Sequence, residues 1–354
     1  MTSTPRGKSR LLLTLLLITA ACLAVRHVVV AAQVQSSAAG HVRIVQTNSG
    51  DTGNIHLIDP ASNTIVGEIK GIPINHGAAA APDGRTLYFS SEAERVLAVV
   101  NAQTLAIVKK VPLSGRPNNI SVARDGRRVY VGIVSEPGAV DVIDTATLER
   151  IKSIPTKGGI HNVYVTPDGR YVVAGSIAGR NMMVIDASTD MPAWSLFSEG
   201  VRPIAFETNR DGSTSRLFVQ LSEVHGFAVV DFKEHKEVAR VMLPEIPVAQ
   251  RDPGPFNAAP SHGIGVAPDG RTLWVCSRPN GAVYAYSLPD LKLLGGVDVG
   301  KRPDWLTFTP DSRRVYIATE STDSVTVVDV PSRTLVTKVM VGDSPKRNIT
   351  AVLR

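Results

Sequence analysis

The segment 82–101, PDGRTLYFSSEAERVLAVVN, holds a tight-turn sequence followed by two strand-like runs. In Pro82-Asp83-Gly84-Arg85 the aspartate can bond nearby backbone amides and the glycine can adopt a positive φ, which is typical of a turn between strands. The run that begins at Leu87 and the run that ends at Asn101 are rich in aliphatic, aromatic and β-branched residues. Short runs of this kind separated by turn residues predict antiparallel β-strands.

The same turn returns along the chain at a nearly constant spacing. Its further copies are Arg124-Asp125-Gly126-Arg127, Pro167-Asp168-Gly169-Arg170, Arg210-Asp211-Gly212, Pro268-Asp269-Gly270-Arg271 and Pro310-Asp311-Ser312-Arg313. The steps between the aspartates are 42, 43, 43, 58 and 42 residues, and the long step carries an inserted loop at 245–260. A period of this length with four short strands is typical of one blade of a β-propeller.

Each end of this repeat array lacks part of a blade. One further step of 42 residues beyond Asp311 reaches residue 353, so the tail 347–353 corresponds to the first strand of an unfinished blade. After the leader, the chain begins instead with a second strand at 41–47. Pairing the two ends removes both unpaired edges. We therefore expect an all-β fold over 41–354, a seven-bladed β-propeller of four-stranded antiparallel blades whose N- and C-terminal segments share one blade.

Composition excludes several classes of protein. The chain has 354 residues, of which 43% are hydrophobic, and two cysteines, Cys22 and Cys276. A packed core is therefore expected, while a disulfide scaffold, a cysteine metal cluster and a covalent c-type haem are excluded. The net charge is +6, but residues 1–32 hold four basic and no acidic residues, which leaves 34 basic against 32 acidic side chains. We therefore expect no nucleic-acid partner.

Residues 1–32 have the organisation of a signal peptide. A polar, cationic start at 1–10 is followed by an apolar run at 11–21 and then by small residues. We expect cleavage between residues 21 and 39, a linker at 33–40, and export to the periplasm or out of the cell.

The same leader does not predict a permanent membrane attachment. Arg26 and His27 interrupt the apolar stretch, which argues against a membrane-spanning helix. Thr19 stands where a lipoprotein signal has leucine, so a lipid anchor at Cys22 is not expected. We expect no membrane span in the mature protein.

Two motifs resemble those of the YVTN family of bacterial and archaeal propellers. Ile44-Val45-Gln46-Thr47-Asn48 and Tyr316-Ile317-Ala318-Thr319 are similar to the tetrapeptide that names the family, and strands ending like Ile143-Asp144 are similar to its Val-Ile-Asp signature. The resemblance covers 41–354 and implies the seven-bladed fold. Members include surface-layer proteins, lactonase-like enzymes and haem- or amine-oxidising modules, so the resemblance leaves the activity open.

Candidate site residues lie at the start of each blade's first strand, because these strands line the central channel. Counting back seven residues from each turn aspartate gives His76, Asn118, His161, Ile204, His262 and Asp304, with Lys346 at the projected seventh position. An apparent insertion before Asp211 leaves Pro203 as an alternative to Ile204. Counting back nine residues gives Arg-Pro pairs at Arg116, Arg202 and Arg302. We expect these side chains to converge at one mouth of the channel.

This set of residues admits three interpretations. The side chains can satisfy backbone carbonyls where the strands meet the channel. They can bind an anionic small molecule, the ligand-binding residues then being His76, Arg116, Asn118, His161, Arg202, His262, Arg302 and Asp304. They can also hold a divalent metal through His76, His161 and His262, with Asp304 as a further ligand, although no close-spaced histidine pair supports this. No cofactor is firmly implied.

Two further features are expected at the same mouth. Loops after the second strands carry Glu92, Glu136, Glu223 and Glu320, which we interpret as charge partners of the basic residues, with a general base as the alternative. The insertion at 245–260 directly precedes His262, so it should overhang this end, either as a functional flap or as a surface elaboration.

These patterns favour an exported propeller that binds a small anion or a protein partner, rather than an enzyme. The sequence has no Gly-x-Ser-x-Gly motif and no dinucleotide fingerprint. The alternatives are a lactonase-like hydrolase that uses His, Arg and Glu at the mouth, and a metal-binding or redox-accessory propeller.

Overall fold

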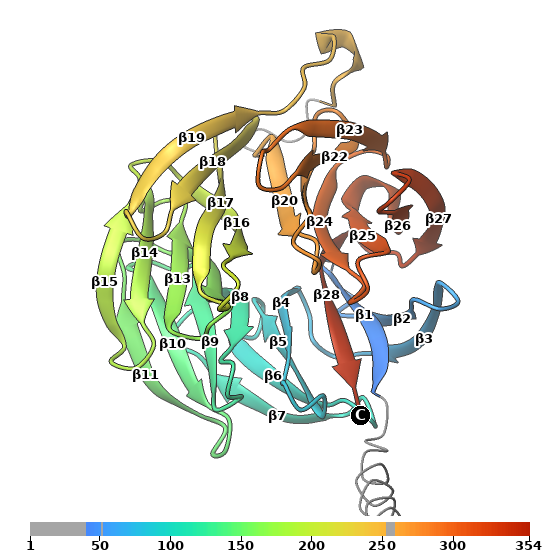
Figure 1. Cartoon of the computed structure of the whole chain (residues 1–354). Coiled ribbons are helices and arrows are strands. Elements are labelled where there is room, and N and C mark those ends of the chain that lie inside the picture. Colours follow the sequence, from blue (N-terminus) through green and yellow to red (C-terminus); the bar gives the residue numbers. More distant parts are fainter. Residues whose placement is uncertain (1–39, 51, 253–258) are drawn as a thin grey trace, which may run out of the picture. The chain divides into compact units, whose positions relative to one another are not determined.

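The computed structural model describes residues 40–50, 52–252 and 259–354, and the propeller is formed by His41–Arg354 (Figure 1). In the described ranges, 28 strands form seven sheets of four antiparallel strands each, which confirms the predicted fold class. The predicted leader, the linker up to residue 39 and Cys22 lie outside the described residues. Within the described ranges, no helix is long and apolar enough to cross a membrane.

The blades are numbered in chain order, with the strands of each given from the innermost to the outermost. Blade 1 is β28 (Pro345–Leu353), β1 (His41–Asn48), β2 (Ile55–Asp59) and β3 (Thr64–Ile69); blade 2 is β4 (Asn75–Ala80), β5 (Thr86–Ser91), β6 (Val96–Asn101) and β7 (Ile107–Pro112). Blade 3 is β8 (Pro117–Val122), β9 (Arg128–Ile133), β10 (Ala139–Asp144) and β11 (Glu149–Pro155); blade 4 is β12 (Ile160–Val165), β13 (Tyr171–Ser176), β14 (Asn181–Asp186) and β15 (Met191–Leu196). Blade 5 is β16 (Val201–Thr208), β17 (Thr214–Leu221), β18 (Gly226–Asp231) and β19 (Lys236–Met242). Blade 6 is β20 (Ser261–Val266), β21 (Thr272–Ser277), β22 (Ala282–Ser287) and β23 (Leu293–Asp298); blade 7 is β24 (Pro303–Phe308), β25 (Arg314–Thr319), β26 (Ser324–Asp329) and β27 (Thr334–Met340).

The two ends of the propeller share blade 1, as predicted. β28 pairs antiparallel with β1 from His41 opposite Leu353 to Asn48 opposite Pro345, and Figure 1 shows the C-terminus beside β1. Leu353 packs into a buried apolar cluster that joins blade 1 to Phe89 of blade 2. Closure therefore combines a strand ladder with hydrophobic burial between neighbouring blades.

The repeated aspartates form hydrogen bonds within turns, as predicted from the sequence. The Oδ1 atom of Asp83 accepts a hydrogen bond from the backbone N of Arg85 at 3.0 Å, and Gly84 has φ +71°. At the end of β10, Asp144 accepts hydrogen bonds from two backbone amides of the following turn, which lowers the pKa of its carboxyl. These carboxylates are committed to local backbone bonds, so they are not candidates for catalysis.

The innermost strands form a closed ring around the propeller axis. Each contacts the innermost strand of the next blade, in the order β4, β8, β12, β16, β20, β24, β28 and back to β4. All seven begin at the same end of the propeller, so their first residues define one mouth.

Candidate functional site

The second residue of each innermost strand occupies one equivalent position around the axis. In every blade the first residue of this strand is paired with the neighbouring strand, an irregularity follows, and pairing resumes within three residues. We call the residues at this position the mouth ring; they are His76, Asn118, His161, Arg202, His262, Asp304 and Lys346. Because neighbouring innermost strands are in contact, the mouth ring gathers side chains from all seven blades.

Blade 5 differs from the sequence prediction at this position. Val201 pairs with Leu221 and Ile204 pairs with Val219, so Arg202 belongs to the mouth ring, and Ile204 packs in the core between blades 4 and 5. The predictions of Ile204 and Pro203 are therefore wrong. The cause is that β16 and β17 have 8 residues each where those of blade 2 have 6, which displaces a count made back from the turn.

Arg116 and Arg302 precede their innermost strands by one residue and lie at the rim of the mouth ring. Arg302 contacts Glu320 at 3.1 Å and has 21% of its side chain exposed, whereas 55% of the Arg116 side chain is exposed. Exposure thus rises from the buried and half-buried ring residues to the rim, which makes this end the solvent-facing side of the site.

Three imidazoles meet inside the mouth ring. The ring centroid of His161 lies 6.2 Å from that of His76 and 6.2 Å from that of His262, and both contacts are edge to face. Burial lowers the pKa of all three imidazoles, with a further contribution from Arg202 for His161. They are therefore uncharged at neutral pH.

Each imidazole directs its Nδ1 atom at an acceptor of the protein. The pairs are His76 with Glu92 Oε1 at 2.5 Å, His161 with Asn162 Oδ1 at 2.7 Å, and His262 with the backbone O of Asp304 at 3.0 Å. An acceptor at Nδ1 keeps the ring proton there and leaves Nε2 as an acceptor. The mouth ring therefore offers three imidazole lone pairs.

This arrangement does not support the predicted metal site. Among the described residues, no group of three or more His, Cys, Asp or Glu side chains is placed to hold a metal ion. His76 and His262 each pack edge to face on His161 instead of surrounding one point. We therefore derive no metal chemistry from these histidines.

A cluster of buried and half-buried charged side chains adjoins the imidazoles. Asp304, which is fully buried, forms ion pairs with Arg278 and with Lys346, whose Nζ lies 2.9 Å from Oδ2. Glu320 lies 3.1 Å from Arg302 and 3.8 Å from Lys346. Two carboxylates thus face three cations within this cluster.

The cations of this cluster outnumber its carboxylates, and burial disfavours their charged forms. Burial lowers the pKa of Lys346 to about 7 and that of Arg278 to about 10, although Glu320 acts in the opposite direction on both. Burial also lowers the pKa of Arg202. This side of the mouth ring therefore has a deficit of negative charge.

One residue deeper along the innermost strands, Arg347 lies on Trp305. Arg347 is 3% exposed, and its guanidinium carbon is 3.6 Å from the centroid of the Trp305 ring. Burial lowers the pKa of Arg347 to about 10, and the Tyr164 hydroxyl partly opposes this. The sequence pattern did not predict four residues of this site, Arg347, Trp305, Tyr164 and Arg278; the available signal was that Arg347 directly follows the projected position Lys346.

The four predicted mouth acids all have partners. Glu92 pairs with His76 and lies 3.7 Å from Arg116, and Glu320 belongs to the charged cluster above. Glu136 accepts a hydrogen bond from the backbone N of Gly159 at 3.2 Å. Glu223, which is 79% exposed, lies 3.6 Å from Arg180.

The described part of the insertion at 245–260 borders the charged cluster. The backbone N of Asp252 donates to the Pro279 carbonyl at 2.9 Å, and the backbone N of Arg278 donates to the Pro260 carbonyl at 3.0 Å. Since Arg278 pairs with Asp304, the insertion is attached to the loop that supplies this cation. Residues 253–258 lie outside the described residues.

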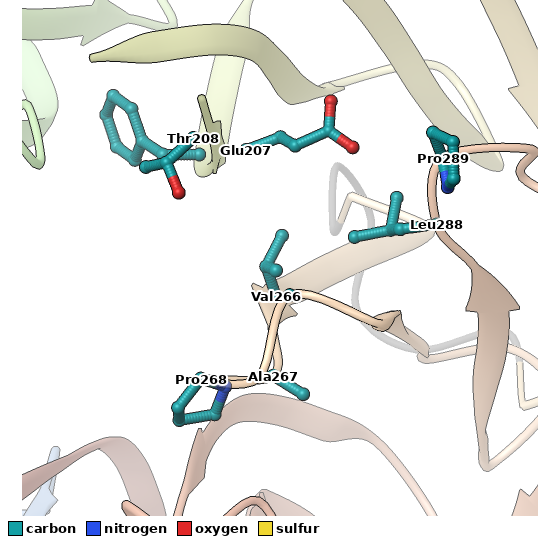
Figure 2. A pocket seen from close by; sticks show the side chains of 9 residues that line it. Glu207, Thr208, Val266, Ala267, Pro268, Leu288 and Pro289 are labelled. Carbon is teal, nitrogen blue, oxygen red and sulfur yellow. The ribbon is translucent and has the colours of Figure 1, made fainter. Parts of the chain in front are cut away.

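A pocket at the opposite end of the propeller lacks comparable chemistry (Figure 2). It has a volume of about 270 Å³ and lies between the end of β16 and the turn after β20. Its carboxylate, Glu207, is already bound by Arg216 through contacts of 2.6 and 2.8 Å. The other side chains that line it are chiefly apolar residues and prolines, so the mouth ring is the better candidate site.

Family comparisons agree with the propeller architecture. The family model described as lactonase, 7-bladed β-propeller, matches residues 144–345. The model described as the cytochrome D1 heme domain matches residues 43–163. No curated protein matches the chain.

Solved structures similar to this chain include the periplasmic gluconolactonase of Pseudomonas aeruginosa, with a TM-score of 0.71 at 18% identity over 88% of this chain and 100% of that chain. Hydrazine synthase of Kuenenia stuttgartiensis gives a TM-score of 0.67 at 20% identity over 84% of this chain and 97% of that chain. Dihydro-heme d1 dehydrogenase gives 0.62 at 18% identity over 85% of this chain and 64% of that chain. At these identities the similarities show the fold alone.

The mouth ring does not fit a haem group. The side chains that could ligate an iron are His76, His161 and His262, and His161 packs edge to face against both of the others. Among the described residues, no group of three or more His, Cys, Asp or Glu side chains is placed to hold a metal ion, so we derive no step through a haem.

Proposed function

The chain belongs to the family of lactonases with a seven-bladed β-propeller, and on the geometry of its mouth ring we propose that it is an exported protein that binds a small organic anion at the propeller axis. The observation that carries this proposal is the uncompensated positive charge. The cations in or beside the ring are Arg116, Arg202, Arg278, Arg302, Lys346 and Arg347, against the carboxylates of Glu92, Asp304 and Glu320.

An anion would remove the cost of burying these cations. Burial is the largest influence on the pKa of Lys346, Arg278 and Arg347, and in each case it lowers the pKa. A negative ligand favours the charged form of each group and so supplies the missing counter-charge. The three imidazole Nε2 atoms add acceptors for hydroxyl groups. The ring therefore suits a hydroxylated acid better than a simple inorganic ion.

Isothermal titration calorimetry with D-gluconate, and with D-glucitol as the uncharged analogue, tests this function. We expect gluconate to bind and glucitol to bind far more weakly. Arg202→Gln should raise the Kd for gluconate by about 10- to 150-fold, the effect of losing one charge-assisted contact worth about 1.5–3 kcal/mol. Arg313→Gln is the matched control, because Arg313 is exposed in the turn after β24 at the opposite end.

Failure of several different anions to bind would refute an anion-binding function. If gluconate, citrate and phosphate all fail to bind or to raise the melting temperature, the buried cations serve the fold alone. The mouth would then be examined for a protein partner.

Hydrolysis of a lactone is the second candidate, favoured by the His76–Glu92 pair. Glu92 accepts the Nδ1 proton at 2.5 Å, which leaves Nε2 free to take a proton from water. The water oxygen would then bond to the acyl carbon, and nearby guanidinium groups would stabilise the developing oxyanion. The ring C–O bond would break as the protonated Nε2 of His76 returns the proton to the leaving alkoxide oxygen. The product is a hydroxy acid, which is the class of anion that the ring accepts.

Base consumption during hydrolysis of D-glucono-δ-lactone distinguishes the two functions. A lactonase should lose activity by about 100-fold or more in Glu92→Gln and His76→Gln, the usual effect of removing a general base. Binding of gluconate without any turnover above the uncatalysed rate assigns the protein to binding.

Export is part of the proposal and rests on the leader-like segment 1–32. The chain expressed with this segment should be recovered outside the cytoplasm, with a new N-terminus between residues 21 and 39. Recovery of the intact chain in the cytoplasmic fraction would contradict it.

A further inference from the structure

Arg347 has an unused pair of donors in the interior of the propeller. Its Nε and Nη2 atoms are both buried and have no hydrogen-bond partner among the described residues. In a guanidinium group these two nitrogens carry the parallel N–H bonds of one edge. That edge matches the two oxygens of a carboxylate, which it binds in a bidentate manner.

Trp305 fixes the plane of this donor edge. The guanidinium carbon lies 3.6 Å from the centroid of the indole ring, so the two planar groups are in face contact. A stacked guanidinium has lost most of its rotational freedom before a ligand arrives, and the ordering cost on binding is correspondingly small.

Tyr164 supplies a third donor beside the same guanidinium. Its hydroxyl oxygen accepts hydrogen bonds from Asn162 Nδ2 at 3.2 Å and from the backbone N of Ile204 at 3.4 Å. With its oxygen accepting twice, the hydroxyl has its own proton left to donate. Burial raises the pKa of Tyr164, and a hydrogen bond and the positive charge of Arg347 partly oppose this, so the two groups are in contact.

The neighbours above Arg347 do not compete for its donors. Burial lowers the pKa values of His76 and His161, and the positive charge of Arg347 makes a further contribution in the same direction. Their Nδ1 atoms are engaged by Glu92 and Asn162. A purely structural arginine would place its donors on carbonyl or carboxylate oxygens of the protein, since buried donors without partners are costly.

We infer that Arg347 anchors the carboxylate group of the ligand through Nε and Nη2, with Trp305 beneath the guanidinium and Tyr164 as the third donor. The inference rests on the proposed anion-binding function and specifies the chemical group recognised. A carboxylate, with two coplanar oxygens, is preferred over phosphate, and the remainder of the ligand extends toward the three imidazoles.

Calorimetry with D-gluconate and D-gluconamide on the wild type and Arg347→Lys tests this. The lysine variant keeps the positive charge but lacks the parallel pair of N–H donors. Gluconamide keeps the hydroxyl groups of gluconate but not its carboxylate. We expect the Kd for gluconate to rise at least about 10-fold in Arg347→Lys. Gluconamide should bind both proteins equally weakly, and inorganic phosphate should bind the wild type more weakly than gluconate. Arg313→Lys, at the opposite end, should behave as the wild type.

A second measurement requires no variant to fold. In wild-type protein with ¹⁵N-labelled arginine, gluconate should shift a buried Nε–H signal and gluconamide should not. Unchanged gluconate affinity in Arg347→Lys with weakened affinity in Arg202→Gln would overturn this inference and leave the proposed function standing. Equal binding of gluconate and gluconamide, or no Nε–H shift, would also overturn it. Absence of all anion binding would overturn both.

Discussion

Leu353 and Val352 are neighbours on the closing strand with opposite environments. Leu353 is 7% exposed and belongs to the same buried apolar cluster as Leu87 and Phe89 of blade 2, whereas Val352 is 47% exposed. Leu353→Ala should lower the free energy of unfolding by about 2–3 kcal/mol, near the low end for a buried leucine because the end of a strand can relax into part of the space. Val352→Ala should cost less than about 0.5 kcal/mol.

Urea unfolding followed by tryptophan fluorescence measures both variants. The slope of the free energy against urea should stay constant, so the midpoint alone reports the loss of stability. The backbone bond from Arg354 N to the Gly84 carbonyl, 3.0 Å long, is retained in both variants and does not enter the difference. Equal losses in the two variants, or a loss below about 0.5 kcal/mol for Leu353→Ala, would refute the reasoning that closure depends on burial between blades 1 and 2.

Three further predictions concern closure, a buried lysine and a buried thiol. Deletion of 345–354 removes the innermost strand of blade 1, so the protein should lose several kcal/mol or fail to accumulate in soluble form; a truncated protein that melts within a degree or two of the parent would contradict the shared blade. Because burial lowers the pKa of Lys346 from 10.5 to about 7, the folded state binds fewer protons than the unfolded state between these values. The free energy of unfolding should therefore rise with pH above 7, by at most about 1.4 kcal/mol per pH unit, and gluconate affinity should fall over the same range; Lys346→Met should flatten both trends. Burial raises the pKa of Cys276 to about 12, so thiol reagents at pH 8 should label it only after denaturation, and rapid labelling of the native protein would show that this core opens.

The architecture was predictable because turn chemistry repeats with the blade. The Pro-Asp-Gly-like turns provide a reference aspartate in each repeat. Counting back from these aspartates located the mouth-ring position correctly in six of the seven blades, from His76 on β4 to Lys346 on β28. The failure at Ile204 has a simple origin. The longer hairpin of blade 5 adds residues between the start of β16 and the turn aspartate. The spacing alone does not show whether the added residues come before or after Ile204.

The deeper part of the candidate site was not predictable in the same way. In a regular strand, consecutive side chains face opposite sides, so a residue adjacent to a channel-facing position is expected to face away. The irregular pairing near the start of β28 breaks this alternation and brings Arg347 inward directly after Lys346. Arg278 comes from a loop of another blade and reaches Asp304 through the tertiary fold alone.

The strand that completes blade 1 also carries Lys346 and Arg347, so assembly of the propeller and assembly of its candidate site are a single event. A chain with blades 2 to 7 formed, but with β28 not yet paired to β1, has six of the seven mouth-ring residues and no guanidinium on Trp305. An anion bound by Arg347 would then stabilise the closed ring of blades. By thermodynamic linkage, any ligand concentration above its Kd shifts the opening equilibrium of this blade toward closure, by about 2.7 kcal/mol at 100 times the Kd. Hydrogen exchange of the β1 and β28 amides is where this coupling would be visible.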